Sequence, residues 1–213
     1  MVNIYLIRHG ETKWNREKVF RGQMDIPLNE FGRLQAEKLS ETLKMQKLKN
    51  PVFISSPLKR ARETAEIATN LFAKAEININ DAFIDISFGQ WEGLPLHEIE
   101  SDYPDLYQTW VQNPEKVDFP NGENIKVVAD RAEEGIYQAV HANPESELVI
   151  VAHRVINKAL LCRLLGMELK AFWKLRQDTA CLNELYFDKD DFILVRLNDT
   201  CHLKSLETDI IDF

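Results

Sequence analysis

The sequence predicts an α/β fold whose mostly parallel open sheet is flanked by helices on both faces. Short apolar runs alternate along the chain with amphipathic segments of helical period, which is the pattern of parallel strands joined by crossover helices. Two of the runs, at residues 2–7 and 148–152, are apolar at nearly every position, as in strands that are buried on both faces. A late pair of runs has only a short turn between them, so at least one late strand is expected to run antiparallel.

The first strand is predicted at residues 2–7, and Arg8, His9 and a flexible Gly10 follow at its carboxyl end. Residues 14–28 have no sustained period and contain glycine and proline, so they are expected to form a loop over the end of this strand. Asn29 then caps a helix predicted to reach about Leu48.

A strand, a turn and a helix are predicted around residues 52–72. Residues 52–55 form the strand, and Ser56 followed by Pro57 is typical of a helix N-cap with proline at the first helical position. This numbering puts Arg60 in the first turn, where unpaired N–H groups already favour an anion. A β-like segment at residues 77–86 then leads into a polar and aromatic loop.

The second half of the chain begins with short helical pieces at residues 95–111 and an irregular stretch at residues 113–122. We interpret residues 95–121 as a small helical cap or lid within a single domain that spans residues 1–213. The remaining elements are a long helix at 124–142, a strand at 148–152 that ends in His153 and Arg154, a helix at 155–165, and strands at 182–187 and 192–197 that form a hairpin.

Composition excludes several classes of function. The chain has 26 Lys and Arg against 34 Asp and Glu, a net charge of −8, which argues against a general nucleic-acid surface. No apolar run is long enough to span a membrane, and the absence of a signal-peptide pattern favours the cytoplasm. Cys162, Cys181 and Cys201 lack metal-binding spacing and are expected to be buried free thiols, so neither a disulfide framework nor a metal site is predicted.

An anion site is predicted where two strands and a helix end. Arg8 and His9 follow one predicted strand, His153 and Arg154 follow another, and Arg60 opens a helix. Open α/β sheets bind ligands at the carboxyl ends of their strands, so these cations and imidazoles are expected to converge. A phosphomonoester dianion needs such cations, together with a nucleophile and an acid for the leaving alkoxide.

Five segments, in order along the chain, resemble the histidine phosphatase superfamily, also called the phosphoglycerate mutase-like family. They are LIRHGET at 6–12, RGQMDIPL at 21–28, SSPLKRARETA at 55–65, DISFGQWEG at 85–93 and VAH at 151–153. Residues 172–180 and 199–203 look like the tails of its small cytoplasmic phosphoserine phosphatase and α-ribazole phosphatase-like members. The resemblance implies a phosphatase of small phosphomonoesters that needs no metal or cofactor and forms a phosphohistidine.

The resemblance implies that His9 is the nucleophile, with Arg8, Arg60 and His153 as the cations around the phosphate. His9 must attack as neutral imidazole, so its far nitrogen is expected to bond a backbone carbonyl. The family has glutamate where this chain has Asp85, which we expect to act as the general acid with a shorter reach. Glu92 is the rival candidate, although its context in the family is structural.

Further residues are candidates for substrate contacts. Thr12 and Asn15 are interpreted as donors to phosphate oxygens or as local caps, and Arg154 as a contact to phosphate or carboxylate or as an outward salt bridge. Arg62 is expected on the surface, and Trp14, Phe20, Trp91 and Trp110 in the pocket wall or the core. The remaining candidates are Arg21 and Gln23 of the matched loop and His202, which on a strand would point away from Cys201 and approach the mouth of the site.

Two other functions use the same residues. A phosphoglycerate mutase would retain a diphosphorylated intermediate, but mutases of this family carry extra lid segments and this chain looks compact. A catalytically weak module that binds phospho-ligands or proteins is the other alternative. The expected ligand is a small phosphorylated metabolite, with a carboxylate if Arg154 faces the pocket, and pairing of two subunits through an edge strand into a homodimer is left open.

Overall fold

The computed structural model of the 213-residue chain describes residues 1–73 and 75–206. Its strands are β1 (Val2–Arg8), β2 (Pro51–Ser55), β3 (Ile77–Ile79), β4 (Glu147–Ala152), β5 (Leu182–Asp188) and β6 (Asp191–Asp199). Its α-helices are α1 (Lys13–Arg16), α2 (Glu30–Met45), α3 (Lys59–Thr69), α4 (Leu96–Asp102), α5 (Pro104–Gln112), α6 (Ile125–Ala142) and α7 (Arg154–Leu164). Its 3-10 helices are η1 (Asp81–Phe83), η2 (Gly89–Trp91), η3 (Pro114–Lys116), η4 (Leu169–Lys174) and η5 (Cys201–Leu203).

The strands form one sheet in the order β3-β2-β4-β1-β5-β6. Strands β1 to β4 are parallel to one another, β5 is antiparallel to β1, and β6 is antiparallel to β5. The predicted α/β class and the antiparallel late hairpin are therefore confirmed. Arg8 pairs with Ala152 in the register of β1 and β4, so the residues after these two strands emerge side by side.

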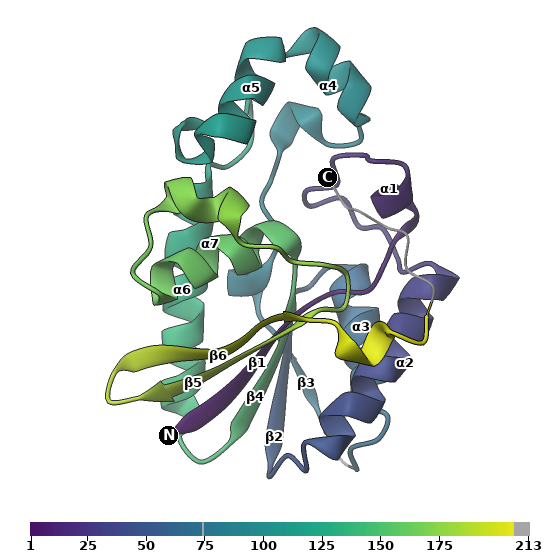
Figure 1. Ribbon diagram of the computed structural model, residues 1–213, viewed down its shortest axis with the longest axis vertical. Helices are drawn as coiled ribbons and strands as arrows, with labels where there is room; N and C mark the ends of the chain where they lie inside the picture. The colour runs from purple at the N-terminus through teal and green to yellow at the C-terminus, as the bar shows by residue number, and fades with distance from the viewer. Residues whose placement is uncertain (74, 207–213) are drawn as a thin grey trace.

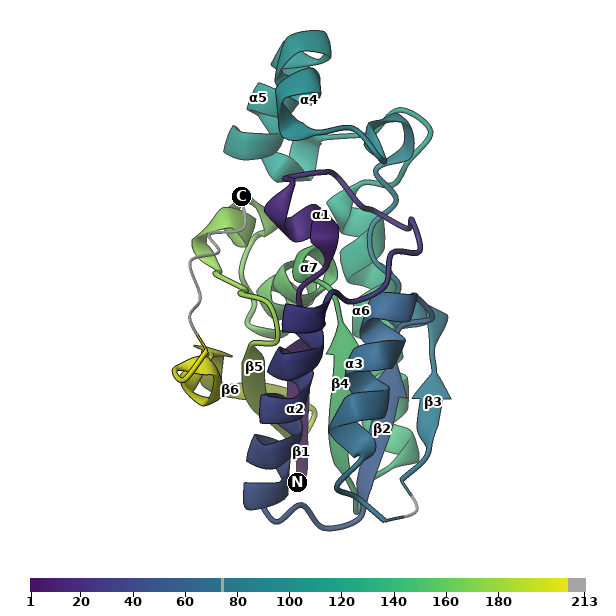
Figure 2. The ribbon, with the colours of Figure 1, turned by 90° about the vertical axis from the view of Figure 1, so that its right-hand side faces the viewer.

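Helices cover both faces of the sheet (Figures 1 and 2). Helices α2 and α3 pack on one face, where Leu39, Leu43, Phe53, Ala61 and Ala65 belong to one buried cluster. Helices α6 and α7 pack on the other face around a larger core. Because the apolar positions of both helix pairs recur at helical spacing, the sheet is buried on two sides, and the strand ends are left as the open edge for a site.

Helices α4 and α5 form a separate group beyond the carboxyl ends of the parallel strands, at the top of Figure 1. Ring contacts join this group to the rest of the molecule: Trp110 of α5 lies 5.3 Å from Phe119, edge to face, and 5.4 Å from Phe172, tilted, between ring centroids. Phe20, from the loop after α1, lies 5.1 Å from Trp91. These aromatic side chains, Phe20, Trp91 and Trp110, are all buried. Their packing stabilises the position of α4 and α5 over the strand ends.

Helix α3 starts two residues later than the sequence predicts. Leu58, not Ser56, is the N-cap, and Lys59 is the first helical residue. The Ser56 hydroxyl is used elsewhere: it bonds the Nε2 atom of His153 at 2.7 Å and accepts from Leu58 N–H at 3.4 Å. Ser56 to Leu58 thus forms a turn, and Arg60 still falls in the first turn of the helix.

Other boundaries and exposures also differ from expectation. The loop predicted at residues 14–28 includes the end of the short helix α1, and β-structure after residue 77 lasts for only three residues before η1. Cys201 is exposed, whereas Cys162 and Cys181 are buried as predicted. No helix within the described part of the chain is both long enough and apolar enough to cross a bilayer.

Candidate active site

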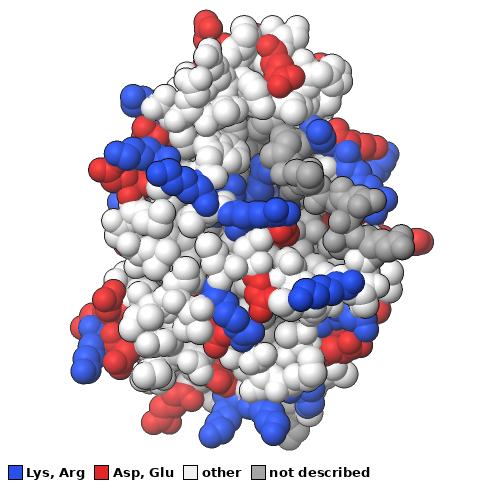
Figure 3. All heavy atoms as spheres, viewed as in Figure 1, with Lys and Arg blue, Asp and Glu red and all other residues white. Residues whose placement is uncertain are grey.

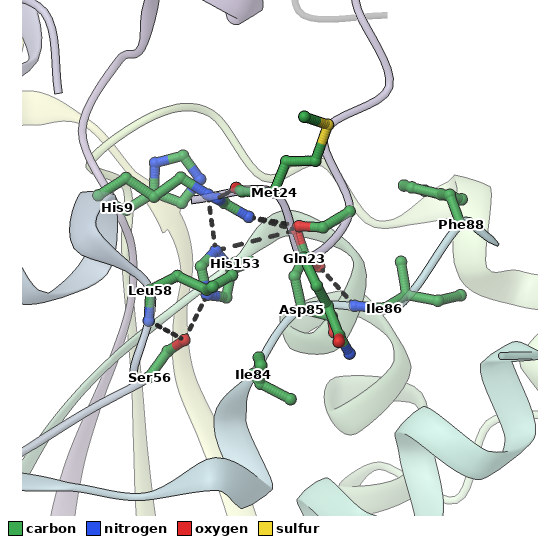
Figure 4. Close-up of polar contacts among 12 residues, drawn as sticks. His9, Gln23, Met24, Ser56, Leu58, Ile84, Asp85, Ile86, Phe88 and His153 are labelled. Carbon is green, nitrogen blue, oxygen red and sulfur yellow. Dashed lines mark hydrogen bonds and ion pairs between the residues drawn. The ribbon is translucent and has the colours of Figure 1, made fainter. Parts of the chain in front are cut away.

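The two strand-end histidines face each other. His9 follows β1 and His153 follows β4, and because these strands are adjacent and parallel the imidazole centroids lie 5.1 Å apart. Both side chains are buried, at 1% and 0% exposure. Figure 4 shows His9, His153 and Asp85 turned toward one another, so the convergence expected from the sequence is present.

Backbone bonds fix the position and the tautomer of His9. Its N–H donates to Ala152 O at 3.0 Å, and its carbonyl accepts from Ala180 N–H at 3.1 Å. Its Nδ1 atom lies 2.6 Å from the carbonyl oxygen of Gly10. Since a carbonyl only accepts, Nδ1 carries the hydrogen and Nε2 keeps its lone pair. Burial, followed by the charge of Arg60, lowers the pKa of His9 well below 6.5, so the ring is neutral at neutral pH.

Arg60, in the first turn of α3, bonds the loop after α1, Asp85 and His153. Its Nη1 and Nη2 atoms donate to the carbonyls of Met24, at 2.8 Å, and Gly22, at 2.7 Å. Nη2 also lies 3.3 Å from Asp85 Oδ2, and Nε donates to His153 Nδ1 at 3.2 Å. Burial lowers the pKa of Arg60 to about 10, which leaves the guanidinium charged at neutral pH.

The bonds and the burial of His153 favour its neutral form, whereas the sequence interpretation gave it a cationic role. Because its Nδ1 accepts from Arg60, its hydrogen is on Nε2, which donates to the Ser56 hydroxyl at 2.7 Å. Burial is the largest cause, and the arginine charges add to it, in lowering the pKa of His153 well below 6.5. In this geometry His153 orients Arg60 and does not add a positive charge.

Asp85 has the environment of a proton donor. Its carboxylate is 5% exposed, with Oδ2 beside Arg60 and 3.8 Å from His153 Nδ1. Burial raises the pKa of Asp85 above 3.8, against the lowering effects of Arg60 and Arg21. A raised pKa keeps a proton on the carboxyl over a wider pH range, as a general acid requires.

Glu92, the rival candidate for the acid, has a structural position. Its Oε1 atom accepts from the backbone N–H groups of Gln23 and Phe88, both at 3.0 Å. The carboxylate therefore ties the loop after α1 to the loop after Asp85. It has no contact with His9, Arg60 or His153 among the hydrogen bonds and ion pairs of the described residues.

A clamp that the sequence interpretation missed holds the Asp85 loop. Arg131 of α6 donates to the carbonyls of Ala82 at 2.9 Å, Ile84 at 2.7 Å and Asp85 at 3.1 Å. Glu123 lies 3.3 Å from Arg131 and accepts from the N–H of Ser87 at 2.8 Å. The available signal was an arginine three residues after Val128, at the border of the apolar stripe of α6.

Three further arginines surround the site. Arg8 is fully buried and its Nη1 donates to Gln177 O at 2.6 Å. Arg21 and Arg154 are both 8% exposed and line one small cavity together with Asp85. A row of Lys and Arg side chains runs across this face of the molecule below α4 and α5 (Figure 3). The local charge is thus positive although the chain carries a net −8.

The other candidate substrate contacts lie in supporting positions. The Asn15 Oδ1 atom accepts from the N–H and the hydroxyl of Thr12, both at 2.9 Å, so the pair caps α1. Gln23 donates from Nε2 to Asp85 O at 3.1 Å. His202 bonds Ala180 O at 3.1 Å from the turn η5, which corrects the strand expected there.

The surface expectation for Arg62 is confirmed, since its side chain is exposed and pairs with Glu66 along α3. In residues 1–73 and 75–206, no group of three or more His, Cys, Asp or Glu side chains is arranged to hold a metal ion.

Comparison with known proteins identifies the family. The family profile described as "Histidine phosphatase superfamily (branch 1)" matches residues 4–200. The chain belongs to this superfamily. As a histidine phosphatase it is a phosphoric monoester hydrolase that acts on a small phosphorylated substrate.

Relatives of this histidine phosphatase match it along almost the whole chain. It is 34% identical to "Phosphoserine phosphatase 1" of Hydrogenobacter thermophilus over 204 residues, which are 95% of each chain. The structure of Bacillus stearothermophilus YhfR superimposes with a TM-score of 0.90 at 29% identity, covering 96% of this chain and all of that one. A phosphoserine phosphatase mutant from Entamoeba histolytica, in complex with phosphoserine, has a TM-score of 0.84 at 26% identity, covering 95% of this chain and 100% of that one.

Proposed function

We propose that this histidine phosphatase hydrolyses its phosphomonoester by double displacement through His9, with Asp85 as general acid and then general base. The observation that carries the proposal is that two titratable side chains of one buried site, His9 and Asp85, have pKa values shifted in opposite directions. Burial lowers the pKa of His9 and raises that of Asp85, so it favours the unprotonated imidazole and the protonated carboxyl that the two roles require.

In the first step, Nε2 of His9 attacks phosphorus in line with the ester oxygen. The new N–P bond forms as the P–O ester bond breaks, and the proton of Asp85 passes to the departing oxygen. Arg8, Arg21 and Arg60 offset the charge on the phosphoryl oxygens. The bond from Nδ1 to Gly10 O stabilises the positive charge that develops on the imidazole.

In the second step, the Asp85 carboxylate accepts a proton from a water molecule as that water attacks phosphorus. The N–P bond breaks, phosphate leaves, and Asp85 has regained the proton it lost. His153 acts as a positioning residue, because its Nδ1 accepts a hydrogen bond from Nε of Arg60 while its Nε2 bonds the Ser56 hydroxyl.

We propose that the substrate carries a carboxylate, which Arg154 contacts. Arg154 lies at the first position of α7, lines the small cavity with Asp85, and lowers the pKa of that carboxyl through its charge. An arginine in this position suits a second, planar anionic group on the substrate. Residues 95–121 then act as the cap of a single domain, since α5 faces Arg154 across the neighbouring cavity.

Two features outside the site support proposals about the oligomeric state of the protein and the compartment in which it works. Strand β6 is an edge strand with alternating exposed residues Ile193, Val195 and Leu197, which suits pairing with a second copy into a homodimer. The three free cysteines suit a reducing compartment such as the cytoplasm. Light scattering of the purified chain tests the dimer: a mass of one chain at micromolar concentration contradicts it.

The test of the reaction is phosphate release from a panel of phosphomonoesters by the wild-type chain and by His9→Ala. We expect turnover by the wild type, loss of all but a trace by the folded variant, and an acid-labile phosphoryl group trapped on the wild type after rapid quenching. Residual activity above a trace in folded His9→Ala refutes the role of His9. Isomerisation of 3-phosphoglycerate faster than phosphate release would instead indicate a mutase.

A panel with no turnover at all by the wild type would instead favour the phospho-ligand binding module. Binding of phosphate esters without hydrolysis, measured by calorimetry, would identify that outcome.

A further inference from the structure

A second cavity lies beside the candidate active site, and the reaction steps described above assign it no occupant. Its volume is about 200 Å³. The side chains that line it come from the loop after α1, from α5, from the start of α7 and from η4: Phe20, Tyr107, Trp110, Val111, Arg154 and Trp173. All but Arg154 are apolar or aromatic, so the cavity favours an apolar occupant.

The cavity adjoins the small cavity that contains Asp85. Phe20 and Arg154 line both this cavity and the small cavity that contains Asp85 and Arg21. Asp85 protonates the oxygen of the leaving group, so the leaving group starts at Asp85. From there, a leaving group that extends past Phe20 and Arg154 would reach the apolar cavity.

The wall formed by Trp173 is already fixed in place. Its Nε1 donates to Trp110 O at 2.7 Å, and the two indole rings lie 5.2 Å apart at a steep angle. On its faces, the charges of Arg154 and Lys158 lie 5.9 Å and 4.5 Å from the ring centroid. A wall that is held before binding loses little conformational entropy when a ligand packs against it.

We infer that the preferred substrates are phosphomonoesters whose leaving group carries an apolar body the size of one aromatic ring. An apolar cavity of about 150 Å³ holds benzene in a protein interior, so the present cavity has room for a phenyl or similar ring. A serine-sized leaving group would leave most of this space unfilled and lose the dispersion contacts of its lining. The inference rests on the proposed function, because it assumes that Asp85 faces the leaving group.

The experiment compares ethyl phosphate with 2-phenylethyl phosphate, two alkyl esters that differ by one ring. We expect kcat/KM of the wild type to be higher for 2-phenylethyl phosphate on the order of 30-fold, from burial of a side group the size of phenylalanine. In Val111→Trp the added indole fills the cavity from its rim, and this ratio is expected to fall close to one.

A matched control is Val127→Trp, on the outer side of α6. Val127 is 49% exposed and Val111 is 48% exposed, so both variants place the same bulky ring at an equally exposed valine. The control is expected to keep the wild-type ratio of the two substrates. Thermal unfolding of both variants identifies any that fails to fold, and Trp173→Ala, which is expected to lower the ratio, then serves as the second test.

The outcomes separate this inference from the proposed function. Hydrolysis of both esters with equal kcat/KM overturns the apolar subsite and leaves the phosphatase reaction in place. A preference for the phenyl ester that survives both Val111→Trp and Trp173→Ala also overturns it, because the ring then binds elsewhere. Failure of the wild type to hydrolyse any phosphomonoester contradicts the proposed function itself.

Discussion

The hydrogen bonds between Arg131 and the Asp85 loop lead to a prediction that tests proton donation by Asp85 separately from the rest of the reaction. Arg131→Met removes the donors to three carbonyls and keeps the apolar stem of the side chain. A hydrogen bond from a charged donor contributes about 1.5–3 kcal/mol to stability. The Arg131 side chain is 21% exposed, so water can replace some of the hydrogen bonds that the three carbonyls lose. We therefore expect the unfolding free energy to fall by about 2–4 kcal/mol. Urea unfolding measures this loss.

The same variant should lower activity only where the leaving group needs a proton. General acids contribute about 10²- to 10⁴-fold, and a loosened Asp85 still held by Arg60 at 3.3 Å keeps part of this, so kcat/KM for ethyl phosphate should fall about 10- to 50-fold. For p-nitrophenyl phosphate, whose phenolate leaves without protonation, the change should stay within about 3-fold. Asp85→Asn should show the same contrast more strongly.

The control for this prediction is Arg163→Met. Arg163 of α7 pairs with Asp130, the residue next to Arg131, but makes no bond to the Asp85 loop among the described residues. It should leave the ratio between the two substrates unchanged. An equal loss on ethyl and p-nitrophenyl phosphate in Arg131→Met would refute the reasoning, because the arginine would then support the fold alone.

Three further predictions test packing, titration and the rival acid. In Gly10→Ala the new Cβ would meet Gly32 O at 2.4 Å, so the unfolding free energy should drop by about 1–3 kcal/mol in urea, and an unchanged midpoint would contradict this close approach. His153 has a folded-state pKa below its unfolded value of about 6.5, so its stabilising contribution is full above that pH and is lost as pH falls, by up to about 2 kcal/mol at pH 5. His153→Gln should reduce this acid loss, and identical pH curves for variant and wild type would show that the histidine does not titrate in this way. Glu92→Ala should lower kcat/KM for ethyl and p-nitrophenyl phosphate by the same factor, whereas a selective loss on ethyl phosphate would make Glu92 the acid.

The sheet and its helices were predictable because their signals are local. Periodic apolar positions predicted α2, α3, α6 and α7 to within a few residues, and the hairpin of β5 and β6 followed from its short turn. The start of α3 was wrong for a tertiary reason. Ser56 has the residue type of an N-cap, but its hydroxyl is bonded by His153, which lies 97 residues further along the chain.

The convergence of Arg8, His9 and His153 could also be predicted, because parallel neighbouring strands deliver their carboxyl ends to one edge. The protonation of these groups could not. The neutral state of His153 depends on its burial and on the direction of its bond to Arg60, and neither is encoded by the residues next to it. The clamp by Arg131 is likewise a contact between α6 and a loop 46 residues earlier.

The sequence by itself determined the superfamily and the α/β class, and it predicted which residues converge at the strand ends, since strand periodicity and short motifs depend on neighbouring residues. Only the tertiary structure decided which imidazole nitrogen of His9 is free, that burial raises the pKa of Asp85, and that an apolar cavity adjoins the site. These properties are set by desolvation, charge and packing among side chains from distant segments, and those quantities exist only once the chain has folded.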